Sequence, residues 1–428
     1  MNVDVAIVGA GPAGVACARE LESAGVTSFA LLDDSPVEPG TFLPAMIPPK
    51  TTDAIGAIRD DLVVGTCYNY AVGCREKLAR IPAAVKQLPH IGLFVNKPAY
   101  YTWLREPFSD RVVRARATGF EVLGDGVVLH ATGKDGEFDV KANLLVVASG
   151  FGNVNDRPPF AAGDLEVPKT INTVWVRFSP LTGTQIDEAG ELGIVWNSKI
   201  SKRAYLNWYN IPGVGFYVAI LDAASREHLA DLVERVVERH PVVSQLVANS
   251  ERLDVLGKPR VFIELPRTMP KRTFGPRVLV AGARAGFNNT FVYEGVWQSF
   301  LSGSCAGKVA AGAVRAGKYD AATLSAYEAK WKEAVDAPNL KPGRASASVF
   351  YESGKLDQVA RALVTGLLRE NSKPPRERQL QHLFLDTMLS AEYSRKNDLT
   401  WARALLANVS LLQKATLAPV LLRAAFKG

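Results

Sequence analysis

The chain has 428 residues, of which 47% are hydrophobic and 22% are charged, enough to bury a large core in two or three structural units. It contains no apolar run of about twenty residues, which excludes a membrane-spanning helix. Its N-terminus lacks the basic region and cleavage site of a secretory signal, so we expect a cytoplasmic protein.

The net charge of +7 comes from the end of the chain. From Leu340 onward, 14 Lys and Arg face 7 Asp and Glu, whereas the earlier residues carry 36 of each sign. A basic segment suits an anionic surface, either lipid or nucleic acid. We expect peripheral membrane contact through this segment and no nucleic acid partner, because the sequence has no zinc finger or RNA-binding consensus.

The first 34 residues predict a strand, a glycine turn, a helix and a second strand. Residues 4–8 and 28–32 are apolar strand-forming runs, and residues 15–24 have apolar residues at helical spacing. The turn reads Gly9-Ala10-Gly11-Pro12-Ala13-Gly14, and the second strand ends at Asp33-Asp34.

This order of parts predicts a dinucleotide site. Gly9 permits the turn, Gly11 lets a pyrophosphate approach the backbone, and Gly14 lets the helix lie close to the strand. The helix N-terminus would face the phosphates, and Asp33 stands where a carboxylate would bind ribose hydroxyls. The alternative is an α/β unit with a glycine turn and no nucleotide.

The middle of the chain is richer in strands. Residues 40–90 carry five prolines around an expected helix at 68–79. Further elements are expected in this order: a helix at 95–105, a meander over 112–141, a buried strand at 143–148 with a glycine turn at 149–153, strands at 171–179, 193–196, 205–208 and 215–221, and an amphipathic helix at 224–240.

A second pattern of strand, glycine turn and helix begins near Arg277. Residues 277–281 form an expected strand, Gly282-Ala-Arg-Ala-Gly286 a turn, and Glu294-Gly295 opens a helix rich in small residues. Small side chains let such a helix pack close to another backbone or to a cofactor.

Metal and nucleophile motifs are missing from the sequence. The five histidines lack metal-ligand spacing and no nucleophile elbow occurs, so we expect no metal and assign no catalytic residue. Cys67 and Cys74 stand seven residues apart, and the spacing leaves open a packing role or a redox role.

Three stretches resemble the flavoprotein superfamily that includes p-hydroxybenzoate hydroxylase, and within it the geranylgeranyl reductase group. They are residues 9–33, residues 144–150 and residues 282–295, the last similar to the family's second FAD motif. The resemblance implies an α/β fold, with a Rossmann-like FAD-binding domain of the glutathione-reductase type, an inserted mixed α+β substrate domain and a C-terminal helical segment. The expected boundaries are 1–165 and 275–335 for the FAD-binding domain, 166–274 for the substrate domain and 336–428 for the helical segment.

The resemblance also implies FAD as cofactor. It assigns the ADP half to Gly9, Gly11, Pro12, Ala13, Gly14, Asp33 and Asp34, and the remainder to Gly282, Ala283, Gly286, Phe287, Glu294 and Gly295. Two departures concern the cofactor: Ala283 and Ser149 stand where the family has Asp. A third concerns the substrate, since the reductases' Cys-Gly-Gly element has no match over residues 40–50.

A cluster of aromatic residues with few ionisable neighbours suggests a pocket for a hydrophobic small molecule or lipid. Its expected lining is Trp208, Tyr209, Phe291, Tyr293 and Trp297, beside Phe287. The alternative is that these side chains form ordinary inter-domain core. Only one ADP-binding fingerprint occurs, so the electron donor would be a transient NAD(P)H or a protein.

The tail begins with a Pro/Gly-rich stretch, 336–344, that predicts a linker. Helices are expected at 355–369, 376–394, 400–412 and 415–426, with a break at Pro419. The last helix suits a membrane interface, a cap over the substrate pocket or a dimer surface, and the sequence does not choose among them.

Two classes of function follow. The first is an FAD-dependent oxidoreductase that reduces isoprenoid double bonds, with a monooxygenase of an apolar or aromatic substrate as the alternative chemistry. The second is a non-catalytic scaffold of flavoprotein fold that binds lipid.

Overall fold

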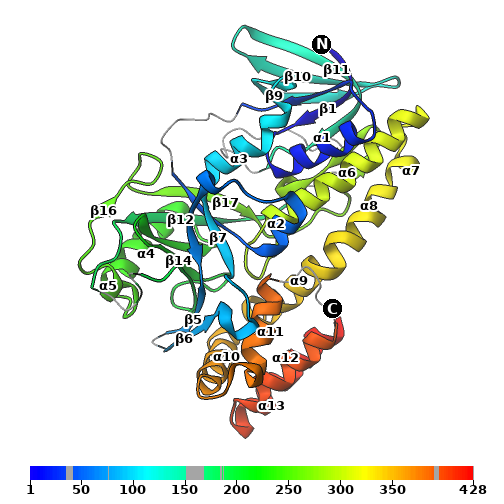
Figure 1. The fold of residues 1–428 in the computed structure, drawn as a ribbon. Helices are drawn as coiled ribbons and strands as arrows, with labels where there is room; N and C mark the ends of the chain where they lie inside the picture. Colours follow the sequence, from blue (N-terminus) through cyan, green and yellow to red (C-terminus); the bar gives the residue numbers. More distant parts are fainter. Residues whose placement is uncertain are drawn as a thin grey trace. The chain divides into compact units, whose positions relative to one another are not determined.

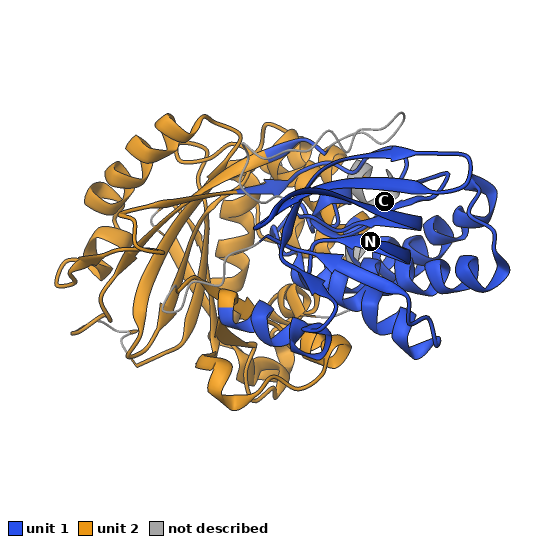
Figure 2. Cartoon of the chain, turned by 90° about the horizontal axis from the view of Figure 1, so that it is seen from above, with its two compact units in different colours: residues 1–39, 99–170, 264–340 blue, residues 40–98, 171–263, 341–428 orange. Residues whose placement is uncertain are grey.

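The computed structural model describes residues 1–34, 42–75, 77–150, 168–183, 186, 188–389 and 395–427. The chain packs as two units, each built from three separate segments (Figure 2). Unit 1 comprises Met1–Pro39, Ala99–Thr170 and Glu264–Leu340. Unit 2 comprises Gly40–Pro98, Ile171–Ile263 and Lys341–Gly428.

These units divide the chain differently from the segments expected above. Residues 40–98, expected in the FAD-binding domain, belong to unit 2, because β5 (Asn69–Cys74) and β6 (Lys77–Pro82) extend its main sheet. Residues 341–428, expected as a separate segment, also pack in unit 2.

Unit 1 is built on a parallel sheet with the strand order β19-β11-β1-β2-β8. Figure 1 labels β1 and β11 of this sheet. Its strands have buried apolar runs, as strands covered on both faces require. The arrangement confirms the expected α/β fold. The strand bounds are β1 (Asn2–Val8), β2 (Phe29–Leu32), β8 (Val112–Val113), β11 (Gly136–Val147) and β19 (Val278–Val280), with β18 (Phe274–Gly275) antiparallel at the edge.

One long strand, β11, covers both the last strand of the expected meander and the expected buried strand at 143–148. Its first half pairs antiparallel with β10 (Val127–Gly133), which pairs in turn with β9 (Ala115–Val122). Its second half pairs in parallel with β1 and β19. The expected meander is therefore continuous with the central sheet.

Two helices of unit 1 cross at unusually close range. They are α1 (Pro12–Ser23) and α6 (Val296–Ala316). A Cβ on Gly303 would lie 2.0 Å from the carbonyl oxygen of Ala13, and a Cβ on Gly307 would lie 2.6 Å from that of Cys17. Glycine at both positions lets α6 pack directly on the backbone of α1.

The end of unit 1 is helical where a linker was expected. After α7 (Ala321–Leu324) and α8 (Ala326–Trp331), residues Lys332–Leu340 form π-helical turns that contain Pro338, and α9 (Lys341–Ala347) follows in unit 2. The linker prediction was wrong, because Val335, Asn339 and Leu340 are buried and hold this stretch in the core.

Unit 2 is built on a mixed sheet with the order β16-β12-β15-β14-β13-β5-β6, referred to below as the unit 2 sheet. Helix α4 (Arg226–Arg239), capped by the Ser225 side chain, packs its apolar stripe on one face. The four strands expected between 171 and 221 are confirmed. The bounds are β12 (Thr170–Phe178), β13 (Glu191–Trp196), β14 (Leu206–Ile211), β15 (Gly215–Asp222), β16 (Arg252–Leu253) and β17 (Val261–Pro266), with α5 (Val243–Leu246) after α4.

The helix expected at 68–79 is instead the β5–β6 hairpin. In β6, Ala79 and Ile81 are buried while Leu78, Arg80 and Pro82 are only partly buried, an alternation that suits a strand. The helix-forming residues around Arg75 misled the prediction, because pairing of β5 with β13 decides the local structure.

A second, three-stranded sheet in unit 2 has the order β3-β7-β4. Phe94 in β7 contacts Tyr209 of the unit 2 sheet, with ring centroids 5.6 Å apart. The bounds are β3 (Pro44–Ile47), α2 (Pro49–Ile55), β4 (Val63–Cys67), η2 (Ala83–Lys86), β7 (Gly92–Asn96) and α3 (Lys97–Arg105).

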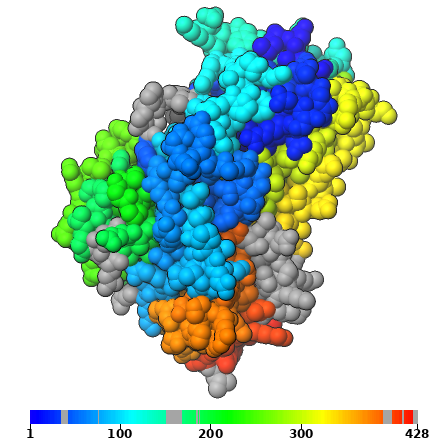
Figure 3. Space-filling view, in the orientation of Figure 1, coloured from blue at the N-terminus to red at the C-terminus, as the bar shows by residue number. Residues whose placement is uncertain are grey.

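The C-terminal helices pack on unit 2 through aromatic side chains. Trp196 Nε1 donates to Tyr351 Oη at 3.0 Å, and the rings of Tyr70 and Phe384 lie 5.6 Å apart. In the space-filling view the orange surface of this segment lies beside the blue surface of residues 77–86 (Figure 3). The bounds are η7 (Ser348–Glu352), α10 (Leu356–Glu370), η8 (Pro375–Glu377), α11 (Gln379–Leu389), α12 (Arg395–Ala407) and α13 (Leu411–Lys427).

Helix α13 continues through Pro419, so the expected break is wrong. Proline forfeits one backbone hydrogen bond, but Leu417 and Leu421 are buried on either side of it and hold the helix together. Among the described residues, no helix combines the length and apolarity needed to cross a bilayer.

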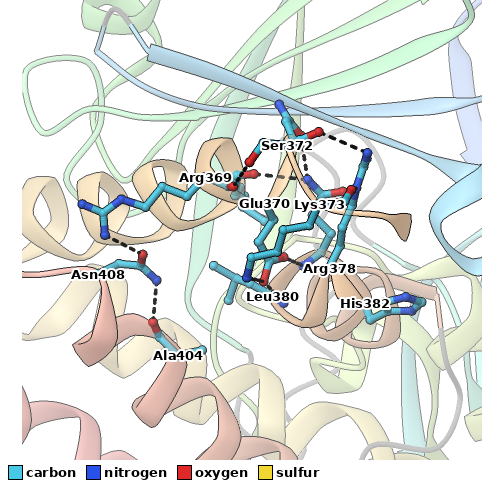
Figure 4. Close-up of polar contacts among 12 residues, drawn as sticks. Arg369, Glu370, Ser372, Lys373, Arg378, Leu380, His382, Ala404 and Asn408 are labelled. Atoms are coloured by element: carbon cyan, nitrogen blue, oxygen red, sulfur yellow. Dashed lines mark hydrogen bonds and ion pairs between the residues drawn. The ribbon is translucent and has the colours of Figure 1, made fainter. Parts of the chain in front are cut away.

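The junction of α10 and α11 is fixed by a buried carboxylate (Figure 4). Glu370, 7% exposed, accepts hydrogen bonds from the amides of Leu380 and Gln381, both at 3.0 Å. Arg378 Nε donates to the carbonyl of Lys373 at 2.8 Å and closes the connecting loop. The N-terminus of α11 thus takes its cap from the last turn of α10.

Candidate functional site

The candidate cofactor site lies at one edge of the parallel sheet of unit 1. Val8 pairs with Leu32 and with Val147, and Val147 pairs with Val280. The carboxyl ends of β1, β2, β11 and β19 therefore lie side by side, and the residues after them gather at the same edge. We call this the nucleotide edge, since ligands of open α/β sheets bind there.

The backbone of the first glycine turn requires glycine at two positions and leaves room at a third. Gly9 has φ of 98°, and a Cβ there would lie 2.5 Å from the carbonyl oxygen of Ala148. A Cβ on Gly14 would lie 1.9 Å from the carbonyl oxygen of Gly9. Helix α1 can therefore pack this close to the turn only with glycine at position 14. Gly11 has no described atom within 4 Å of its Cβ position, which leaves room for a ligand at the start of α1.

The N-terminus of α1 presents its backbone to this open space. Pro12 occupies the first turn of the helix and Gly11 offers no side chain to cap it. Unsatisfied amides and the positive end of the helix dipole favour a phosphate at such a position. Pro12, Ala13 and Gly14 are buried, so the backbone is held in place.

The two acidic residues after β2 differ in how far they are exposed to solvent. Asp33 is 7% exposed and its Oδ2 accepts the amide hydrogen of Ala10 at 2.6 Å, whereas Asp34 is exposed. Asp33 therefore holds the glycine turn through Ala10. It does so from the position where we expect its carboxylate to bind a ribose.

Arg105, at the end of α3, is a functional candidate that sequence reasoning missed. Its Nη1 lies 3.8 Å from Asp33 Oδ1 and the side chain is buried. Burial lowers the pKa of Arg105, Asp33 opposes that shift, and Arg114 adds to it. The only sequence signal was a cation at the end of an otherwise apolar helix.

The second glycine turn reaches the same edge. Gly282 has φ of 66° and its amide donates to Ser302 Oγ at 3.0 Å, while a Cβ there would lie 2.8 Å from the Ala13 side chain. Gly286 has φ of 77°, and a Cβ there would lie 2.3 Å from the carbonyl oxygen of Thr268. Both glycines of the second motif are thus required by the backbone.

Buried amides hold the loop that follows. Asn289 Oδ1 accepts the amide hydrogen of Phe291 at 3.0 Å, and its Nδ2 donates to Asn339 Oδ1 at 3.2 Å. Gln298 Nε2 also donates to Asn339 Oδ1, at 2.8 Å. The sequence gave no signal for this network, because Asn339 lies in the stretch expected as a linker.

The aromatic residues that the sequence grouped are divided between the two units. Phe291, Tyr293 and Trp297 are buried in unit 1, where Phe287 packs edge-on against Trp331 with centroids 5.2 Å apart. Glu294 and Gly295 precede α6 as expected.

Trp208 and Tyr209 belong to unit 2 and point to opposite faces of its sheet. Trp208 lies in the core under α4, where its Nε1 donates to Glu191 at 3.2 Å. Tyr209 contacts Phe94 and Trp175 on the other face. Of this pair only Tyr209 is on the face that α4 leaves uncovered.

The cysteines fit packing better than redox chemistry. Cys67 and Cys74 lie on strands, so the helical spacing considered for them does not apply. Both are buried, and burial raises the pKa of each thiol, which keeps it protonated and unreactive. Burial likewise raises the pKa of Cys305 to about 11.

The fold and the nucleotide edge are those expected of an FAD-binding α/β protein, and solved structures of flavin-dependent proteins share the fold. The chain superposes on a geranylgeranyl bacteriochlorophyll reductase-like protein from Thermoplasma acidophilum with a TM-score of 0.74 and 16% identity, covering 100% of this chain and 99% of the other. It superposes on the flavin-dependent brominase Bmp2 with a TM-score of 0.68 and 12% identity, covering 95% and 98%.

Comparison of amino-acid sequences gives a more specific similarity than comparison of folds. Digeranylgeranylglycerophospholipid reductase 2 of Methanopyrus kandleri is 24% identical over 395 residues, which cover 85% of this chain and 91% of that protein. No family model matches the chain. The resemblance to the flavoprotein superfamily, and within it to geranylgeranyl reductases, is confirmed.

Proposed function

We propose that the protein is an FAD-dependent oxidoreductase that reduces carbon–carbon double bonds in an isoprenoid substrate. One observation carries the proposal: two glycine turns with ligand-binding geometry meet at the nucleotide edge, in a chain related over most of its length to a digeranylgeranylglycerophospholipid reductase. Relatedness of this extent makes isoprenoid lipid the substrate class to test first.

The chain's own residues divide the work of holding the cofactor. Gly9, Gly11, Pro12, Ala13, Gly14 and Asp33 would hold the ADP half of FAD, with Arg105 beside Asp33. Gly282, Ala283 and Gly286 would hold the middle of the cofactor, and the loop from Phe287 to Gly295 would adjoin its ring system. When bound, FAD supplies hydride-transfer chemistry, and the protein supplies position and a water-poor surrounding.

The electron donor binds transiently and has no permanent site on the protein. Only one ADP-binding fingerprint is present in the sequence, so a transient NAD(P)H or a protein donor reduces the flavin.

Membrane contact belongs to the same proposal. Arg369, Lys373 and Arg376 are exposed around the α10–α11 connection, and Leu368 and Leu422 are exposed apolar residues of the same tail. Basic and apolar groups together suit a peripheral contact with anionic lipid. Flotation with anionic but not zwitterionic vesicles is the expected result.

The alternative chemistry is oxygenation. Its support is the shared fold with a flavin-dependent brominase and the lack of the reductases' Cys-Gly-Gly element at 40–50. Rapid reoxidation by air with a hydroxylated product would favour it over reduction.

The test begins with the purified protein, which should be yellow with FAD bound. Under anaerobic conditions with dithionite as donor, a panel of prenyl lipids should gain two hydrogens per reduced double bond. Gly11→Val fills the open space before α1 without meeting another residue, so it should fold yet lose FAD.

Gly124→Val is the matched control, since Gly124 also faces open space but lies away from the nucleotide edge. It should keep both FAD and activity. A wild-type protein that is colourless and cannot be loaded with FAD would overturn the proposal.

A further inference from the structure

The face of the unit 2 sheet opposite α4 carries polar atoms that nothing in the described structure satisfies. By strand alternation, Thr173, Arg177, Asn207 and Tyr217 all point to this face, whereas Val174, Val176, Trp208 and Val218 point to the α4 core. Thr173 Oγ1, Arg177 Nε, Asn207 Oδ1 and Tyr217 Oη are buried and have no hydrogen-bond partner among the described residues. We call it the open face because α4 does not cover it, although Phe94 of the three-stranded sheet contacts it at Tyr209.

Two of these groups lie together. Arg177 and Tyr217 are directly paired across β12 and β15. A Cβ on Gly215 would lie 3.3 Å from Arg177 Nε and 3.4 Å from Tyr217 Cε2, so glycine leaves both groups room over the same spot. Tyr217 is 0% exposed, and no described residue supplies an acceptor for its hydroxyl.

The guanidinium of Arg177 is held in one orientation. Its Nη2 donates to the carbonyl of Val214 at 3.0 Å, and its Cζ lies 5.7 Å from the ring centroid of Phe42 and 5.5 Å from that of Tyr217. Phe42 and Tyr217 stack with centroids 5.8 Å apart. Two aromatic rings and one backbone hydrogen bond therefore hold the guanidinium of Arg177, and its buried Nε belongs to the residue paired across the strands with Tyr217.

The surroundings are apolar. Trp175 and Ala219 occupy the next row of the open face, and Tyr209 contacts Trp175 with centroids 5.3 Å apart. Burial raises the pKa of Tyr217, so its hydroxyl remains a neutral donor at physiological pH. Two preorganised donors, one of them charged, in apolar surroundings fit an oxyanion attached to an apolar body.

We propose that Arg177 and Tyr217 form an oxyanion subsite that binds the phosphate end of an amphipathic isoprenoid substrate. This inference rests on the proposed function for the prenyl chain and adds the group that recognises its polar end. The polar atoms of Thr173 and Asn207 continue the site along the open face.

The experiment measures binding to the FAD-loaded protein by tryptophan fluorescence, without turnover. The probes are farnesyl monophosphate, farnesol and inorganic phosphate. Farnesyl monophosphate should bind at least about tenfold more tightly than farnesol, in line with a charge-assisted hydrogen bond. Inorganic phosphate alone should bind far more weakly than the phosphate on a prenyl chain.

Two variants and one control test the residues. Tyr217→Phe removes a single oxygen and keeps the ring that stacks on Phe42, and Arg177→Gln removes the charge. Both should weaken farnesyl monophosphate binding and leave farnesol binding unchanged. Arg252→Gln, which removes a cation paired with Glu234 of α4, should change neither affinity.

Failure of the subsite and failure of the proposed function give different results. Equal binding of farnesyl monophosphate and farnesol, unaltered by Tyr217→Phe, would overturn the subsite while the prenyl substrate stands. Equal binding of inorganic phosphate and the prenyl phosphate would also overturn it, by assigning a free anion. Binding of none of the prenyl probes, with FAD retained, would overturn the prenyl substrate class itself.

Discussion

Gly303 of α6 faces the backbone of Ala13 in α1 so closely that a Cβ on Gly303 would lie 2.0 Å from the Ala13 carbonyl oxygen. Ala13 belongs to the first glycine turn, so the position of α6 and the geometry of the cofactor site depend on one glycine.

Gly303→Ala should therefore separate α1 from α6 and distort the turn. We expect a loss of about 1–3 kcal/mol in the free energy of unfolding, as for an overpacked core, together with loss of bound FAD. Chemical denaturation and flavin absorbance measure the two effects. Gly312→Ala, in the same helix but facing open space, should be neutral or stabilising by up to about 1 kcal/mol. Equal behaviour of the two variants would contradict the prediction.

Asp33→Ala should loosen the first glycine turn. It removes the acceptor of the Ala10 amide and the partner of Arg105, which we expect to cost about 1–3 kcal/mol and to weaken FAD binding. Asp33→Asn keeps an acceptor oxygen and should lie between the wild type and Asp33→Ala. The neighbouring Asp34→Ala, at an exposed position, should leave FAD affinity as it was.

Glu191→Gln should change how stability depends on pH. Glu191 is 0% exposed, and burial raises its folded-state pKa above the ordinary value of 4.5, although Arg80 and Trp208 partly oppose the shift. Its favourable contribution is thus present below pH 4.5 and is lost as pH rises through the raised pKa.

Glutamine keeps an acceptor for Trp208 and carries no charge. Relative to the wild type, the variant should gain stability as pH rises from 4.5 to neutrality, as measured by urea unfolding at several pH values. A constant difference between the two proteins across this range would refute the assignment.

Glu370→Ala should destabilise the start of α11. Two buried amides, those of Leu380 and Gln381, would lose their acceptor, at a cost of about 1–3 kcal/mol. Faster amide hydrogen exchange in α11 is the direct readout. Glu377→Ala, in the same connection but exposed, is the control and should exchange like the wild type.

The sequence predicted the order of strand, glycine turn, helix and strand at the nucleotide edge, because backbone geometry there leaves few choices of residue. At Gly9, Gly14 and Gly282, a Cβ atom would lie too close to a neighbouring backbone or side-chain atom. These constraints act on single positions, so they can be predicted from a short sequence motif. The strand that carries Asp33 was predictable for the same reason.

The errors arose where distant segments decide the structure. Residues 68–79 have helix-forming composition, yet β5 pairs with β13 more than a hundred residues later. The stretch 336–344 looked like a linker because of Pro338 and Gly343, while the burial of Asn339 and its bonds to Asn289 and Gln298 are set by tertiary packing.

Strand register was the other quantity the sequence could not supply. Trp208 and Tyr209 are adjacent aromatic residues, and only the pairing of β14 with its neighbours shows which one faces α4. The same register brings Arg177 beside Tyr217, a pairing that no motif announced.

Assembly of unit 2 has a consequence for how the protein is made. Trp196 and Tyr70 each take one aromatic partner, Tyr351 and Phe384, from the last quarter of the chain. During synthesis these contacts form only after the final helices have left the ribosome, so a holding chaperone should associate with the nascent chain through this interval.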